Sequence, residues 1–81
     1  MAEKGLRGRT VEHLRAWRMH RVLNQSELAT AAGVGRTTVL RGEAGHIVNF
    51  ANIRKLAAAL GITPEQLLRE GPEDKEERGA A

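Results

Sequence analysis

A short polar segment in the middle of the chain holds the residues best suited to recognise a partner. Its polar side chains are those of Arg36, Thr37, Thr38 and Arg41. Arginine presents a planar fork of hydrogen-bond donors, and threonine adds a hydroxyl and a methyl group. Val39 gives the segment only a narrow apolar face. A helix with so little to bury adds little to a core, so we expect its polar face to meet another molecule.

The chain offers no comparable set of residues for catalysis or for binding a metal ion. Cysteine is absent, which excludes disulfides and thiolate metal sites. His13 and His20 share a face of one predicted helix, but about two turns (~10 Å) separate them, which is too far for one ion. The acidic run at 73–77 is interpreted as a solvated tail. We therefore expect no enzyme, no metal and no cofactor.

Charge is unevenly distributed along the 81 residues, which are enough for one domain with a tail. Residues 1–70 hold eleven Lys and Arg against six Asp and Glu, whereas residues 71–81 hold two against four. A basic folded part suits a polyanion such as nucleic acid, although a net charge of +3 is modest. No apolar run could span a bilayer, and the N-terminus lacks the apolar region of a signal peptide. We expect a cytoplasmic protein without membrane contact.

Residues typical of helix caps and helix ends divide the chain into five predicted helices, and signals for β-strands are nearly missing. Asn24 with Glu27, and Thr63 with Gln66, have the spacing of capping boxes. The predicted helices cover about 10–22, 25–32, 36–43, 50–60 and 63–70. The sequence thus predicts an all-α domain at 10–70, preceded by a basic arm at 1–9. A charged tail at 71–81 follows, either disordered or extending the last helix.

The second and third predicted helices are joined by Gly33-Val34-Gly35. Two short helices with a glycine-containing turn of this length form a helix-turn-helix. Ala29 and Ala32 allow the helices to approach closely, and two valines pin the second helix to the first. The polar face of that second helix then projects as a ridge that fits the major groove of DNA.

The chain resembles the helix-turn-helix domain of phage repressors and Cro proteins, the XRE family, in the stretch LNQSELATAAGVGRTTVLRGEAG followed by NIRKLAAALGITPEQLL. The matching features, in order, are Gln25, Leu28-Ala29, Gly33, Glu43, Leu56-Ala57, Leu60-Gly61 and Leu67-Leu68. The resemblance covers about Val11 to Arg69. It implies a five-helix, lambda-repressor-like DNA-binding domain.

The resemblance also implies roles for individual residues. The residues expected to contact DNA bases are Arg36, Thr37, Thr38, Leu40 and Arg41. Those expected to contact phosphates are Asn24 and Gln25, at the start of the second helix, and His46. Two alternatives remain open. Asn24 could serve only as a helix cap, and Arg36 and Arg41 could contact phosphates and not bases. Leu40 should face solvent without DNA and meet a thymine methyl group with it.

Arg18 and Glu43 match an ion pair that the family often places between its first and third helices. We expect this pair to be partly buried and structural. Gly42 departs from the family, which usually has a bulky apolar residue there. We expect the resulting gap to lie near Trp17, whose side chain could fill it.

The implied function is sequence-specific binding of double-stranded DNA by a transcriptional regulator. The family usually acts as a homodimer on a palindromic operator. We expect the dimer surface at the last helix and tail, around Leu67, Leu68 and 70–78, or alternatively at Ile47 and Val48. These two loop residues could instead pack inward. Two other interpretations remain open: an antitoxin-like protein that binds a protein partner through its tail, and an adapter that has lost DNA binding.

Overall fold

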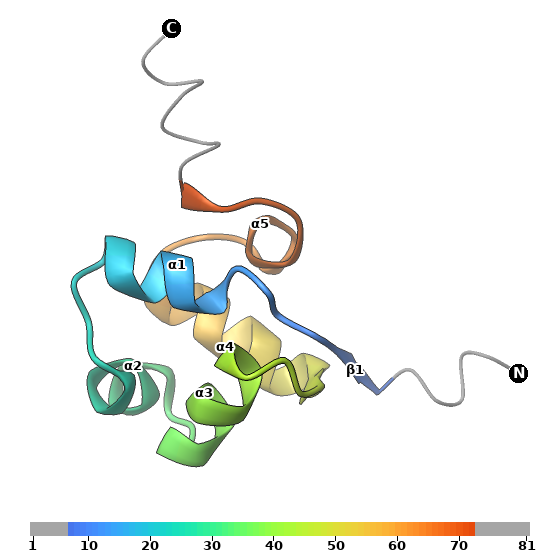
Figure 1. Cartoon of the computed structure of the whole chain (residues 1–81), viewed down its shortest axis with the longest axis horizontal. Helices are drawn as coiled ribbons and strands as arrows, with labels where there is room; N and C mark the ends of the chain where they lie inside the picture. Colours follow the sequence, from blue (N-terminus) through green and yellow to red (C-terminus); the bar gives the residue numbers. More distant parts are fainter. Residues whose placement is uncertain (1–6, 73–81) are drawn as a thin grey trace, which may run out of the picture.

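The computed structural model describes residues 7–72. Its elements are β1 (Gly8–Arg9), α1 (Leu14–His20), α2 (Gln25–Ala32), α3 (Arg36–Glu43), β2 (Val48–Asn49), α4 (Phe50–Leu60) and α5 (Pro64–Arg69). In Figure 1, α4 passes behind α1 through the centre of the molecule, with α2 and α3 on one side and α5 on the other. The five described helices confirm the predicted all-α class.

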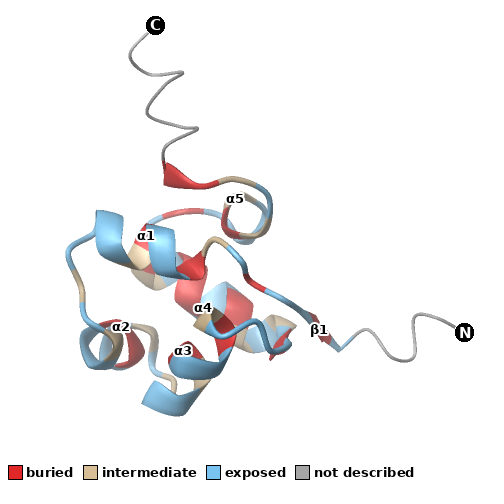
Figure 2. Ribbon diagram, viewed as in Figure 1, coloured by how far each residue is buried: buried red, intermediate tan, exposed pale blue. Residues whose placement is uncertain are grey.

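The core is built around the apolar face of α4. Ile53, Leu56, Ala57 and Leu60 recur at helical spacing and are all buried. Each other helix contributes its own apolar residues to this cluster, and most of the ribbon coloured as buried in Figure 2 lies near the centre of the domain. Full burial of one large apolar side chain stabilises a fold by about 1.5–3 kcal/mol. This shared core fixes the helices relative to one another.

Local capping sets the helix boundaries. Asn24 accepts a hydrogen bond from the Glu27 backbone N–H at 2.7 Å, and Glu27 returns one to the Asn24 N–H at 2.8 Å. Thr63 and Gln66 form the same reciprocal arrangement at the start of α5. Such bonds satisfy N–H groups that lack partners inside the helix. The bounds of α2, α3 and α4 agree with the predicted ranges, although α3 begins after Gly35 without a side-chain cap.

The N-terminal part of the fold differs from the prediction. Gly8 and Arg9, expected in the basic arm before the first helix, pair with β2 as an antiparallel two-stranded sheet. The first helix was expected over 10–22 but spans only Leu14–His20. It ends early because Val22 adopts a left-handed conformation with φ +58°, which no helix continues through.

The end of the described chain is fixed against α1. The indole N–H of Trp17, which is buried, donates a 2.8 Å hydrogen bond to the Glu70 carbonyl oxygen. Gly71 and Pro72 are buried as well, so the packed region continues beyond α5. The rest of the predicted tail, 73–81, lies outside the described residues. Within 7–72, no helix combines the length and hydropathy needed to cross a bilayer.

Candidate nucleic-acid interface

The turn between α2 and α3 sets the direction in which α3 projects. Gly33 takes a left-handed conformation with φ +74°, which glycine adopts without steric cost. The Val34 N–H then bonds to the Ala29 carbonyl at 3.0 Å and closes the end of α2. Gly35 is extended and starts α3. The chain therefore reverses within three residues, and α3 packs directly across α2.

The inner side of α3 is buried and its outer side is open. Val39 and Gly42 face the core, whereas Arg36, Thr37 and Arg41 are exposed and Thr38 is half-buried. Leu40 is 49% exposed, although it is a large apolar residue. Figure 2 shows exposed residues along the outer side of this helix. Among the residues that the structure describes, the four polar side chains form no hydrogen bond or ion pair with one another or with the rest of the fold.

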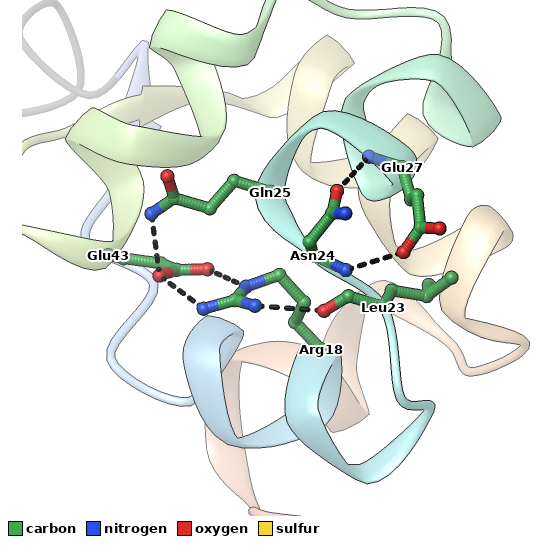
Figure 3. A network of polar contacts seen from close by, with 6 residues as sticks. All are labelled: Arg18, Leu23, Asn24, Gln25, Glu27 and Glu43. Atoms are coloured by element: carbon green, nitrogen blue, oxygen red, sulfur yellow. Dashed lines mark hydrogen bonds and ion pairs between the residues drawn. The ribbon is translucent and has the colours of Figure 1, made fainter.

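An ion pair anchors the C-terminal end of α3. The guanidinium group of Arg18 donates from Nε to Glu43 Oε2 at 2.5 Å and from a terminal nitrogen to Oε1 at 3.1 Å (Figure 3). A second terminal nitrogen donates to the Leu23 carbonyl at 2.8 Å. Both side chains are largely buried, with 13% and 7% of their surface exposed. The structure thus brings together the two residues that the resemblance paired.

The same carboxylate also receives a hydrogen bond from α2. Gln25 Nε2 donates to Glu43 Oε1 at 3.2 Å, so Glu43 connects α1, α2 and α3 (Figure 3). The hydrogen bond from Glu43 raises the pKa of Arg18 above its ordinary value. Arginine is charged throughout the accessible pH range in any case. Sequence reasoning missed the role of Gln25, since no local pattern marks a contact with a distant helix.

Two shallow depressions lie on either side of the exposed face of α3. The first lies between the N-termini of α2 and α3 and is lined by Arg18, Asn24, Gln25, Ser26 and Arg36. Every residue in its lining is polar or charged. It therefore combines two arginines, of which Arg18 is paired with Glu43, with the N-terminal end of α2, where backbone N–H groups point outwards and favour an anion.

The second depression lies between α3, the following loop and the start of α4. It is lined by Thr38, Arg41, Ile47, Val48, Asn49 and Asn52. His46 is exposed in the loop beside it. The predicted base-contacting residues thus lie on one face, with predicted phosphate-contacting residues at both ends of it. Within the described part of the chain, no group of His, Asp and Glu is arranged to hold a metal ion.

Comparison with known proteins identifies the family. The helix-turn-helix family profile matches residues 14–67. The chain belongs to the helix-turn-helix family, of the XRE type. It is also similar to the crystal structure of a hypothetical transcription factor, NHTF, from Neisseria, with 34% sequence identity and a TM-score of 0.69. That similarity covers 94% of this chain and 87% of the other, and no curated protein matches the chain. Both findings support a role in DNA binding.

This helix-turn-helix protein fills the space beside Gly42 differently from the prediction. We expected Trp17 to occupy a gap there. A Cβ on Gly42 would instead lie 3.0 Å from a methyl of Leu14 and 3.1 Å from a methyl of Val48. The prediction was wrong because the β2 strand brings Val48 inward, and Trp17 is turned towards Glu70.

The same inward packing changes the candidate dimer surfaces. Leu67 has no exposed surface and Val48 is 4% exposed, so neither side chain can contact a second subunit. Both were expected as possible subunit contacts, with inward packing as the alternative for Val48, and both belong to the core of the helix-turn-helix domain. Leu68 is half-buried and Ile47 is 68% exposed. These two apolar side chains remain accessible on the two surfaces.

Proposed function

We propose that this protein is a transcriptional regulator that binds double-stranded DNA sequence-specifically, with the first turns of α3 in the major groove. The observation that carries this proposal is the outer face of α3, whose Arg36, Thr37, Thr38 and Arg41 lie outside the apolar core and form no side-chain hydrogen bond or ion pair within the described residues. The fold nevertheless holds that face rigidly through Val39 and Glu43. A role in DNA binding also agrees with the expected cytoplasmic location.

Each exposed side chain has a chemically suitable target in the groove. Arg36 and Arg41 can each donate two parallel hydrogen bonds to guanine O6 and N7. The threonines can bond to bases or phosphates through their hydroxyls. Leu40 presents an apolar surface that matches the methyl group of thymine. One well-formed arginine–guanine contact discriminates against other bases by about 1–3 kcal/mol.

The N-terminus of α2 and the loop after α3 supply contacts to the DNA backbone. The side-chain oxygen of Asn24 accepts the capping bond, which leaves its amide nitrogen free to donate to a phosphate. Gln25 uses one N–H for Glu43 and retains a second. His46 is exposed at the other end of the interface. These groups carry no sequence information and would fix the register of α3 in the groove.

We further propose that the protein binds as a homodimer to a palindromic operator. One module of this size reads about one half-site, and two half-sites lie about 34–36 Å apart in this binding mode. The end of α5, with Leu68, is the proposed contact. Sedimentation at micromolar concentrations, with and without an operator duplex, tests it. A monomer in both conditions, or two proteins bound per duplex without contact between them, would contradict the homodimer.

Selection of bound duplexes from a random pool tests the function directly. It should return a defined motif, and its symmetry and spacing would report the arrangement of subunits. Arg36→Ala should then weaken binding about 10- to 100-fold and relax the preference at one base pair. Gln25→Ala should weaken binding to all sequences about equally.

Lys55→Ala provides a control, because Lys55 is exposed on α4 and lines neither depression. It should leave the selected motif unchanged. Circular dichroism must show that every variant is folded. If Arg36→Ala retains both affinity and base preference, α3 does not read DNA in the proposed way. Weak, sequence-indifferent binding by the wild type would instead favour the adapter interpretation.

A further inference from the structure

The first described residues are attached to one edge of the candidate interface. In the two-stranded sheet, Gly8 lies opposite Asn49 and Arg9 opposite Val48. The backbone N–H of Phe50, the first residue of α4, donates a 3.1 Å hydrogen bond to the Arg7 carbonyl. The chain is therefore held from Arg7 onwards, on the side of α4 where that helix begins (Figure 1).

Gly8 makes this attachment unusually close. A Cβ at this position would lie 2.0 Å from the Val48 carbonyl oxygen and 2.6 Å from its carbon, where no side chain can fit. Gly8 is also buried. Only glycine therefore allows β1 to approach β2 at this distance, and the close approach determines where the neighbouring residues lie.

Arg7 and Arg9 flank this glycine and are exposed. Arg9 follows Gly8 in β1 and Arg7 precedes the strand, so the backbone places both exposed arginines directly beside the buried glycine. Neither side chain forms a hydrogen bond or ion pair with another residue in 7–72. Two positive charges are thus held in place by the backbone without serving the described fold.

The position of the arginines relates them to α3. Val48 and Asn49, which pair with β1, line the same depression as Thr38 and Arg41. Neighbouring strands lie about 4.7–4.9 Å apart, so β1 lies one strand beyond that depression. The exposed Arg7 and Arg9 therefore add positive charge next to the strand that lines this depression together with Arg41.

We infer that Arg7 and Arg9 form a second, sequence-independent contact with DNA, to the phosphodiester backbone flanking the bases that α3 reads. This inference rests on the proposed function. Each arginine that neutralises a phosphate releases condensed counterions, which makes the binding constant depend on salt with a slope of about −0.9 per phosphate. The contact adds affinity and fixes the register of α3, and it does not choose the sequence.

The test compares two double variants with the same change of charge. The first is Arg7→Gln with Arg9→Gln. The second is Arg15→Gln with Lys55→Gln, on α1 and α4, where neither residue lines either depression. Fluorescence anisotropy with the selected duplex and a scrambled duplex, over a range of salt concentrations, gives the affinity and the salt slope. Thermal unfolding should change little in either variant, because all four side chains are exposed.

The first variant should bind both duplexes about tenfold more weakly and keep its preference for the selected sequence. The magnitude of its salt slope should fall by about two. The second variant should change the affinity far less. An unchanged salt slope in the first variant, or an equal loss in both, would overturn this inference and leave the role of α3 intact. If the wild type binds no duplex, both the inference and the proposed function fail.

Discussion

Replacing Val22 by glycine should make the protein more stable. Val22 lies in the turn between α1 and α2 with φ +58°, and 87% of its surface is exposed. The left-handed conformation costs a residue with a Cβ about 1–2 kcal/mol, and β-branched residues are at the upper end. Little packing is lost on removing an exposed side chain. The backbone hydrogen bonds of the turn, such as that from the Leu23 N–H to the Arg18 carbonyl at 3.1 Å, need not change.

Glycine gains freedom in the unfolded chain, which offsets up to ~1 kcal/mol of this relief. The net gain should be about 1 kcal/mol, equivalent to a rise in Tm of about 4–8 °C for a domain of this size. Urea denaturation and calorimetry measure both quantities. Val22→Ala is the matched control, because it removes the branched methyls but keeps the Cβ and should stabilise less. A glycine variant no more stable than the wild type would show that the turn carries no strain at Val22.

Three further substitutions test an ion pair, a close packing contact and a helix cap of the fold. Glu43→Gln should lower the free energy of unfolding by about 2–4 kcal/mol in denaturant titrations, because it leaves a largely buried arginine without its counter-charge. The control is Glu65→Gln, in an exposed ion pair, which should change this free energy by less than about 0.5 kcal/mol. Gly42→Leu should lower the free energy of unfolding by about 1–3 kcal/mol, because even a Cβ at this position would lie 3.0 Å from a methyl of Leu14. An unchanged Tm would mean that the core can rearrange there. Thr63→Ala should cost about 1 kcal/mol through loss of the α5 cap, and full stability would contradict the capping role.

Local signals in the sequence were sufficient to predict most helix boundaries. The bond that begins α2 joins Asn24 to Glu27, and the one that begins α4 joins Asn49 to Asn52. Because these partners lie within one helical turn, their types and spacing reveal the boundary directly. Gly33 and Gly61 end two helices in the left-handed conformation that glycine favours, which is equally a local property.

The features that sequence reasoning missed depend on distant contacts or unusual residues. Each strand of the sheet has only two residues, so the sequence shows no alternating pattern. The pairing also joins two distant segments, the N-terminal part of the described chain and the residues before α4. The first helix was predicted to end at residue 22 and not at His20 because valine, not glycine, occupies the left-handed position at Val22. The filling of the space beside Gly42 depends on Val48, whose inward direction follows from that unpredicted strand.

In the candidate site, too, some features were predicted from the sequence and others were not. The family resemblance paired Arg18 with Glu43, and the two side chains lie in contact. It gave no indication that Gln25 joins the same carboxylate, since that bond requires α2 and α3 to be positioned first. The base and phosphate contacts remain predictions. Their partners are atoms of DNA, and only a bound complex or the proposed variants can test them.

The bond between Trp17 and Glu70 gives the protein a built-in optical reporter. Trp17 is the chain's single tryptophan, and its indole ring is buried where the first helix meets the end of the described chain. Its fluorescence therefore senses whether these two distant segments remain together. DNA contains no tryptophan, and Trp17 lies outside the proposed interface. Unlabelled protein can thus reveal, in a single emission spectrum, whether loss of binding in a variant reflects loss of the interface or loss of the fold.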